Sequence, residues 1–365
     1  MGTIRFLLAI AILCFHTTPL YGNYLYMNQP ALETFFIMSG FYMALILTEK
    51  YSRKADFYRA RALRIFPMYF IFLGMSVVAS VAHGEASIAP GRGWPIAAYD
   101  TWRSHFGELS LGAIISMLLA NLLIFGQDVM MFLKIEGGSL SFTPDFAREA
   151  LPAWKFLFIP PTWSIALELT FYALAPFLVF RSKKALFALL IGGIILKYFL
   201  ASWYGLSNDP WSNRFLPSEL PLFVLGILGY RFYAHYRETL FASRAVTWCS
   251  IGLFAAWIAL IVFYFSIPCE GRATLFLCYS ALAIPFTFEL FKRSRVDQFL
   301  GDLSFPIYLS HYSFMLLVIQ RWDNLSIYVA PITIAFSLGY HLLIGRRIDN
   351  FRHRPSRSQM PAAVS

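Results

Sequence analysis

Residues 4–18, IRFLLAIAILCFHTT, decide how the rest of the chain is interpreted. Ten apolar residues separate Arg5 from His16. At 3.6 residues per turn the spacing is about three turns, so on a helix both side chains lie on one stripe, roughly 16 Å apart. An ionisable side chain within an apolar span is costly and is a functional candidate by default. The alternatives are that Arg5 only sets membrane orientation and that His16 only binds a neighbouring helix.

The composition is typical of a polytopic membrane protein. The 365 residues are 58% hydrophobic, and only 14% are charged; soluble domains have about 25% charged residues. The net charge of +10 would suggest nucleic acid in a soluble protein, but here the basic residues cluster in alternate connections, so we expect no nucleic-acid partner. The four cysteines have neither metal-ligand nor disulfide spacing, and no metal is expected.

Apolar windows of about 17–25 residues predict the membrane spans. The candidates are 4–22, 30–48, 63–82, 109–127, 162–180, 185–204, 215–234, 246–267, 273–291, 303–320 and 325–345. Lys and Arg residues cluster in alternate connections, which places these connections and both termini in the cytoplasm. The clusters lie after the second span, at 181–184, at 231–244, at 292–295 and beyond 345.

Strict alternation of the spans fails near 109–127. Either this segment is re-entrant, or residues 154–159 join it as a second short insertion. We predict an all-α transmembrane helix bundle with about ten crossings and one re-entrant or short non-spanning element. The 128–161 connection should be the longest external feature. One membrane domain is expected over 1–348, followed by a basic, disordered tail at 349–365.

Two polar stretches interrupt the early apolar sequence. In residues 33–41, Glu33 lies near the outer end of a span, while Ser39 and Gly40 favour close helix packing. Arg61 and Arg64 are spaced i, i+3 and therefore share a helix face at the cytoplasmic membrane edge. Such a face serves as a topology signal and contacts lipid headgroups, or it binds the phosphates of a cytoplasmic cofactor.

Glu168 and two histidines lie within later apolar spans. An unpaired carboxylate there costs several kcal/mol unless it is protonated or partnered. His16 is the obvious type of partner, because a carboxylate that orients an imidazole is a familiar catalytic arrangement. For His341 we favour a helix-to-helix hydrogen bond, and for His311 both interpretations stay open.

Together these stretches resemble the acyltransferase-3 family of integral membrane acyltransferases, which includes bacterial O-antigen and exopolysaccharide O-acetyltransferases. The similarity runs in order across nearly the whole chain. The matching residues are Arg5 and His16, Glu33 with Phe35, Phe36, Ser39, Gly40 and Phe41, Arg61 and Arg64 with Pro67, Trp163 and Ser164 with Glu168, Phe171 and Tyr172, and Leu300, Gly301, Tyr308 and His311.

The resemblance implies transfer of an acyl group from cytoplasmic acyl-CoA to a sugar hydroxyl of a cell-surface or exported polysaccharide or its lipid-linked precursor. Acetyl is the leading candidate for the acyl group. No permanently bound cofactor is implied. The location would be the inner (cytoplasmic) membrane, with membrane lipids and polysaccharide-assembly proteins as partners.

The resemblance also assigns roles to residues. His16 would act as general base or be transiently acylated, with Glu168 or Glu33 orienting it. The CoA phosphates would bind Arg5, Arg61 and Arg64. The substrate-binding residues would be Trp163, Ser164, Tyr172 and His311. The alternative is a proton-coupled transporter or flippase that uses the same buried ionisable groups; it predicts two matching halves, which the sequence does not display.

Overall fold

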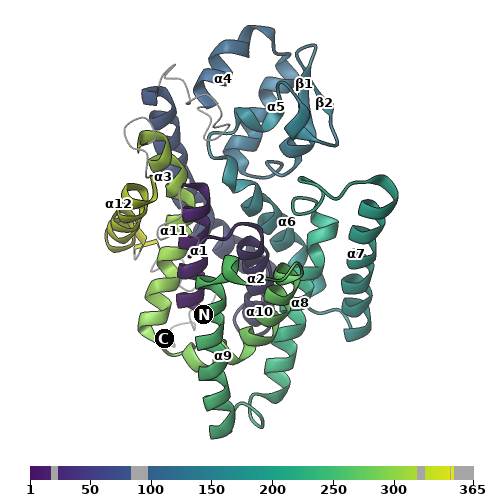
Figure 1. The fold of residues 1–365 in the computed structure, drawn as a ribbon, viewed down its shortest axis with the longest axis vertical. Helices are drawn as coiled ribbons and strands as arrows, with labels where there is room; N and C mark the ends of the chain where they lie inside the picture. The colour runs from purple at the N-terminus through teal and green to yellow at the C-terminus, as the bar shows by residue number, and fades with distance from the viewer. Residues whose placement is uncertain (18–23, 84–97, 319–324, 346, 349–365) are drawn as a thin grey trace, which may run out of the picture.

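The computed structural model describes residues 1–17, 24–83, 98–318, 325–345 and 347–348 as a bundle of α-helices with one small irregular unit at one end (Figure 1). The helices of the bundle are α1 (Gly2–His16), α2 (Gln29–Glu49), α3 (Lys54–His83), α6 (Trp163–Leu178), α7 (Lys183–Tyr204), α8 (Leu216–Tyr236), α9 (Arg244–Val262), α10 (Arg272–Phe291), α11 (Arg295–Val318) and α12 (Leu325–Tyr340), which ends in a π-helical turn, His341–Gly345. The all-α expectation is confirmed for this bundle.

The predicted spans coincide with helices, but several boundaries differ. Helix α1 ends at His16, and residues 18–22 of the predicted span lie outside the described residues. Helix α3 begins at Lys54, and it runs on through Pro67. Helix α11 begins at Arg295, eight residues before the predicted start. Apolar windows detect only the hydrocarbon part of a helix, whereas the helical hydrogen bonds continue into polar sequence at its ends. The proposed tail at 349–365 also lies outside the described residues.

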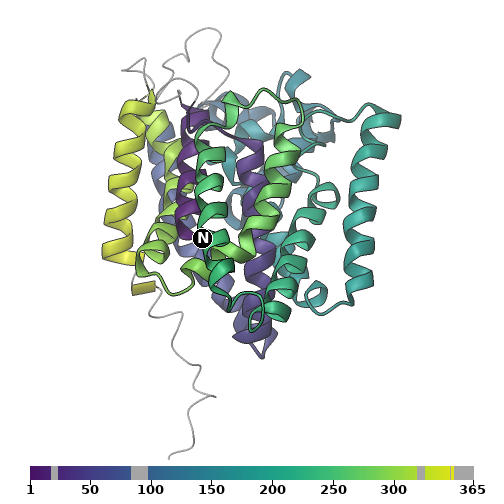
Figure 2. The same ribbon diagram turned by 60° about the horizontal axis from the view of Figure 1, so that its bottom comes forward.

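Six helices of the described chain are long and apolar enough to cross a membrane: α2, α3, α7, α9, α10 and α12. Helix α1 is a shorter apolar helix. The molecule is therefore a helical membrane protein, while ten crossings and the orientation of the termini remain predictions. In Figure 2 the long helices run side by side, and α7 stands at the edge of the bundle.

The irregular unit contains α4 (Ala98–His105), α5 (Leu111–Leu123) and several short 3-10 turns. Helix α5 has 13 residues. Its length of about 20 Å is less than the roughly 30 Å of a bilayer core, which fits a non-spanning element. The apolar piece 154–159 forms a packed corner, because Phe156, Leu157 and Ile159 are fully buried. Whether this corner lies within the membrane stays a prediction.

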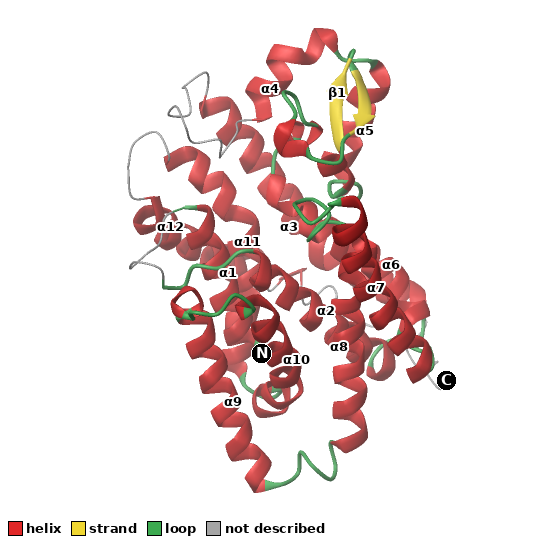
Figure 3. Ribbon diagram, turned by 45° about the vertical axis from the view of Figure 1, so that its right-hand side comes forward, coloured by secondary structure: helices red, strands yellow, loops and turns green. Residues whose placement is uncertain are grey.

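Strands β1 (Leu133–Glu136) and β2 (Ser139–Phe142) form an antiparallel hairpin in the same unit (Figure 3). Gly137 and Gly138 make its two-residue turn, with φ of 56° and 77°. Two residues with positive φ are characteristic of a type I′ turn, which glycine accepts without steric cost. The expected fold class omitted this hairpin, although the Gly-Gly pair was its sequence signal. Below, the end of the bundle beside this unit is called the hairpin end.

Two helix pairs make the closest contacts in the bundle, α1 with α11 and α2 with α8. Gly2 meets Asp297 and His16 meets His311, so both contacts join residues 295 apart and the two helices run parallel in a constant register. In α2–α8 a Cβ added to Gly40 would lie 2.0 Å from the Phe223 carbonyl oxygen, and one added to Gly226 would lie 2.0 Å from that of Ile37. The expected close approach at Gly40 is thereby confirmed.

Candidate active site

A cavity of about 250 Å³ lies among α1, α2, α3, α6 and α11. Arg5, Arg61 and Arg64 contribute its positive charge. Its remaining lining residues include Ser39, Tyr42, Ser164, Glu168, Tyr172, Asp302 and Tyr308. Five of the residues predicted from sequence as cofactor or substrate ligands therefore share one cavity: the three arginines, Ser164 and Tyr172.

The arginine pair of α3 faces this cavity. Arg61 is only 8% exposed, and its guanidinium lies 6.0 Å from the centre of the Tyr172 ring. Arg5 reaches the same region from α1 and interacts electrostatically with Arg64 and Glu168. Burial in a cavity favours the ligand-binding interpretation of these arginines over simple contact with lipid headgroups. Guanidinium groups bind phosphate through paired hydrogen bonds, so the cavity is suited to an anionic ligand.

Glu168 forms part of the cavity wall through two hydroxyl groups. The Ser39 hydroxyl donates to Glu168 Oε1 over 2.7 Å, and the Tyr172 hydroxyl donates to the same oxygen. The sequence suggested only a packing role for Ser39. In the structure its hydroxyl also binds Glu168. The two donors stabilise the charged carboxylate near the arginines.

Two hydroxyl groups line the cavity toward the hairpin end. The Tyr308 hydroxyl donates to the Pro161 carbonyl over 2.6 Å and lies 2.6 Å from the Ser164 hydroxyl. Pro161 belongs to a buried corner where Thr162 bonds to Gln127 and Asn121 binds the Phe156 carbonyl. This network of the hairpin unit holds the corner beside the end of the cavity.

His16 lies just beyond Tyr308 and does not line the cavity. Its Nδ1 is 2.9 Å from Nε2 of His311, whose Nδ1 is 2.7 Å from the carbonyl oxygen of Tyr308. Among the described residues, the bonds of Glu168 go to Ser39 and Tyr172, and those of Glu33 go to Gln29 and Lys197. Neither Glu168 nor Glu33 is therefore the partner seen at His16 Nδ1, where His311 lies instead, and a carboxylate that orients His16 stays a prediction.

Glu33 belongs to a separate polar cluster on α2, α7 and α8. Lys197 Nζ lies 3.7 Å from Glu33 and 3.0 Å from Glu219. Glu219 is fully buried, as is most of Glu33. One lysine thus neutralises part of the charge of two carboxylates at the hairpin end of the α2–α8 pair. The predicted catalytic role of Glu33 gains no support from contacts to His16 or to the cavity.

Trp163 is a buried residue at the start of α6, next to the Pro161 corner. The Arg214 guanidinium stacks 4.1 Å from its ring centre and forms a salt bridge with Asp209 at 2.5 Å. This places a fixed cation over an aromatic face near the histidine pair. Trp163 does not line the cavity, so any substrate contact by Trp163 would be made from the hairpin end.

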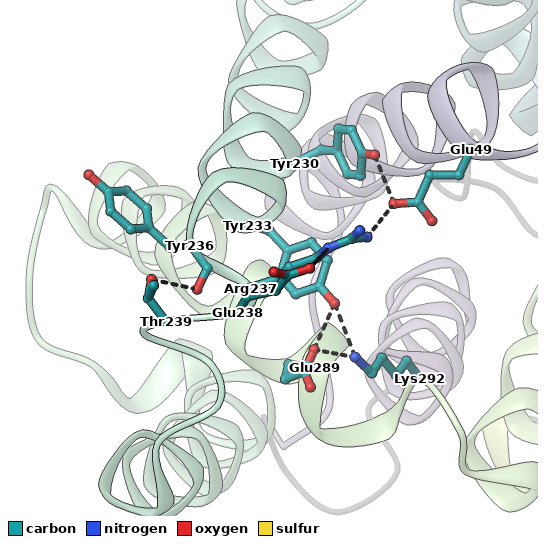
Figure 4. Close-up of polar contacts among 9 residues, drawn as sticks. All are labelled: Glu49, Tyr230, Tyr233, Tyr236, Arg237, Glu238, Thr239, Glu289 and Lys292. Atoms are coloured by element: carbon teal, nitrogen blue, oxygen red, sulfur yellow. Dashed lines mark hydrogen bonds and ion pairs between the residues drawn. The ribbon is translucent and has the colours of Figure 1, made fainter.

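A second cavity, of about 330 Å³, lies at the other end of α2, α8 and α10. Figure 4 shows its cations held by acidic partners: Arg237 bonds to Glu49 at 3.2 Å, and Lys292 bonds to Glu289 at 2.7 Å. Tyr230 and Tyr233 donate to these same two carboxylates. Because each cation is already neutralised, this cavity is the weaker candidate for an anion.

Several site residues were missed by sequence reasoning. Lys197 and Arg214 were each a lone basic residue in or beside an apolar segment, which was the available signal. Glu219 had a similar signal, as a single acidic residue within an apolar segment. Lys197 pairs with Glu33 and Glu219 on other helices, which no local pattern predicts, whereas Arg214 pairs with Asp209 only five residues away.

Residues 2–344 match the acyltransferase-3 family as an acyltransferase domain. The exopolysaccharide production protein ExoZ of Rhizobium meliloti is 22% identical over 298 residues, covering 81% of this chain and 80% of that protein. An uncharacterized protein of Aquifex aeolicus is 26% identical over 219 residues, covering 56% of this chain and 93% of that protein. No solved structure gives a significant match. The chain therefore belongs to the acyltransferase-3 family, and it is a membrane-bound O-acyltransferase.

Proposed function

We propose that the protein transfers an acyl group from cytoplasmic acyl-CoA to a sugar hydroxyl of an exported polysaccharide or its lipid-linked precursor. Acetyl is the leading candidate for this group. The similarity to ExoZ supports the class of acceptor. The observation that carries the proposal is the arrangement along α1, where Arg5 lines the cavity and His16 ends the same helix beyond Tyr308 of the cavity lining.

The donor would enter from the cytoplasmic side. Its phosphates would bind Arg5, Arg61 and Arg64, and its pantetheine arm would extend past Glu168 toward Ser164 and Tyr308. Eleven helical residues span about 16 Å, which brings the thioester toward His16 while the charged part of CoA stays at the arginines. The Lys and Arg distribution supports this orientation, with both termini in the cytoplasm and the protein in the cytoplasmic membrane.

The acceptor hydroxyl would meet the thioester at His16. The imidazole takes the hydroxyl proton as the oxygen bonds to the carbonyl carbon, giving a tetrahedral intermediate. The carbon–sulfur bond then breaks, and the sulfur leaves as CoA thiol after receiving that proton from the His16 imidazolium, which restores the base. The alternative is transient acylation of His16, because the bond of Nδ1 to His311 leaves Nε2 as the reacting nitrogen in either route. Polysaccharide-assembly proteins would supply or consume the acceptor.

The test uses membranes that contain the protein, radiolabelled acetyl-CoA and an exopolysaccharide or lipid-linked oligosaccharide. We expect covalent label on the glycan from wild-type protein, and a loss of roughly 10²–10⁴-fold for His16→Ala, the usual contribution of a general base. His341→Ala is the matched control, a buried histidine that packs against Phe299 away from the cavity. Uptake of sugar without modification, or full activity of His16→Ala, would refute the proposal.

A further inference from the structure

His311 makes a continuous hydrogen-bonded chain with His16 and the backbone. His311 and Tyr308 are both on α11, and the His311 side chain is fully buried. One ring nitrogen, Nδ1, lies 2.7 Å from the Tyr308 carbonyl oxygen, and the other, Nε2, lies 2.9 Å from His16 Nδ1. Both nitrogens of His311 are thus engaged, which fixes the ring.

The chemistry of the chain's partners determines where its protons lie. A carbonyl oxygen can only accept, so His311 Nδ1 carries a proton and donates it. A neutral His311 then has a lone pair on Nε2, and His16 Nδ1 must donate to it. The remaining nitrogen of His16, Nε2, therefore carries the lone pair that a general base needs. Which ring nitrogen is protonated is commonly set in this way by the bond at the other nitrogen.

The two rings meet edge to edge. Their planes differ by only 2° and their centroids are 5.1 Å apart. Parallel rings stacked face to face cannot bring nitrogens to 2.9 Å, because van der Waals contact keeps such faces about 3.5 Å apart. The nitrogens therefore face each other nearly within a common plane, which is the geometry of a directed hydrogen bond.

Contacts at the opposite end of the helix pair fix its register. The Asp297 carboxylate accepts hydrogen bonds from the backbone amides of Gly2 and Thr3 at 2.7 and 2.9 Å, which caps α1. Gly301 approaches Gly2 closely, so the helices cannot slide freely. The constant register then brings His16 opposite His311 at the hairpin end.

We infer that His311 is the positioning residue of His16: it accepts the Nδ1 proton and thereby directs the basic Nε2 toward the reaction. The inference rests on the proposed function, in which His16 is the base. A neutral imidazole suits a buried site better than a carboxylate, because it brings no charge that needs a counter-ion. His311 thus replaces the orienting carboxylate that the sequence suggested.

The test compares His311→Gln with His311→Asn in the same acetyl-transfer assay. Glutamine is long enough to place an acceptor oxygen near the position of Nε2, whereas asparagine keeps only the shorter reach toward the Tyr308 carbonyl. We expect His311→Asn to lower kcat by about 100-fold or more with KM for acetyl-CoA little changed, and His311→Gln to retain activity within about tenfold of wild type. His341→Gln and His341→Asn are the matched controls, and gel filtration in detergent checks folding.

The outcomes separate the inference from the proposed function. If wild-type protein labels the glycan and His16→Ala does not, but both His311 variants remain fully active, His311 does not position the base. If both folded variants are equally inactive, an acceptor alone is insufficient, and the inference also fails. Absence of label with wild-type protein, or an active His16→Ala, would instead contradict the proposed function.

Discussion

The parallel helix pairs α1–α11 and α2–α8 are built alike but end differently. Each pair packs closely at glycines and carries two ionisable side chains at its hairpin end. In α1–α11 these are two imidazoles in direct contact. In α2–α8 they are Glu33 and Glu219, which both approach Lys197 of a third helix.

The difference follows from the donors and acceptors of the side chains. A neutral imidazole has one nitrogen that donates a hydrogen bond and one that accepts, so two histidines can bond to each other without a counter-ion. Two carboxylates offer only acceptors when ionised, so their burial requires a cation or a proton. The histidine pair can therefore accept and release a proton, while the carboxylates are held in a salt bridge.

The opposite ends of the two pairs also differ. Arg5 of α1 lines a cavity with two further arginines. Arg237, which follows α8, is paired with Glu49 of α2. In the proposed function the α1–α11 pair would provide both the anion-binding residue and the base, whereas the α2–α8 pair would be mainly structural. Three predictions test this contrast.

The largest effect is expected from Gly40→Ala or Gly226→Ala. Each new Cβ would lie 2.0 Å from a backbone carbonyl oxygen of the other helix, which no side-chain rotation relieves. Overpacking commonly costs about 1–3 kcal/mol, and a backbone clash exceeds this range. We expect most folded protein to be lost in detergent gel filtration. Gly252→Ala is the control, since its Cβ meets open space; normal yield for Gly40→Ala would contradict the close packing of α2–α8.

A smaller effect, on activity alone, is expected from Arg5→Gln. Hydrogen bonds to charged groups contribute about 1.5–3 kcal/mol, so KM for acetyl-CoA should rise roughly 10- to 100-fold. Arg237→Gln should change KM little, because Glu49 already neutralises that guanidinium. Steady-state kinetics of both variants make the measurement. Equal increases in KM would remove the functional contrast between the two cavities.

The smallest effect is expected from Lys197→Met. Loss of one partner from a fully buried pair costs about 3–5 kcal/mol. The Lys197 side chain is 37% exposed, and the carboxylates can take up a proton, so we expect only about 1–2 kcal/mol of destabilisation. Thermal unfolding in detergent measures it, and adding Glu219→Gln should restore part of the loss. Activity per folded molecule should stay near wild type; a kinetic defect would assign the carboxylate pair to catalysis.

Much of the bundle could be predicted from local sequence. Apolar windows locate its helices because burial in lipid requires long apolar runs, and the spacing of Arg61 and Arg64 predicted their common face. The Gly137-Gly138 pair is a sequence signal for a turn, but the strands on either side have only four residues each and were too short to be recognised. The contacts of Glu33 with Lys197, of Glu168 with Ser39 and of His16 with His311 could not be predicted, because each joins distant segments.

The sequence by itself determined the helical membrane fold and the family, because hydrophobicity, periodicity and the order of motifs can be read along the chain; it also supplied the candidate site residues. Only the tertiary structure decided that His16 meets His311 and that Glu168 belongs to the arginine-lined cavity. The physical reason is the parallel register of α1 and α11, fixed by close glycine contacts and by Asp297 at one end. That register selects one polar partner from several that the sequence makes equally plausible.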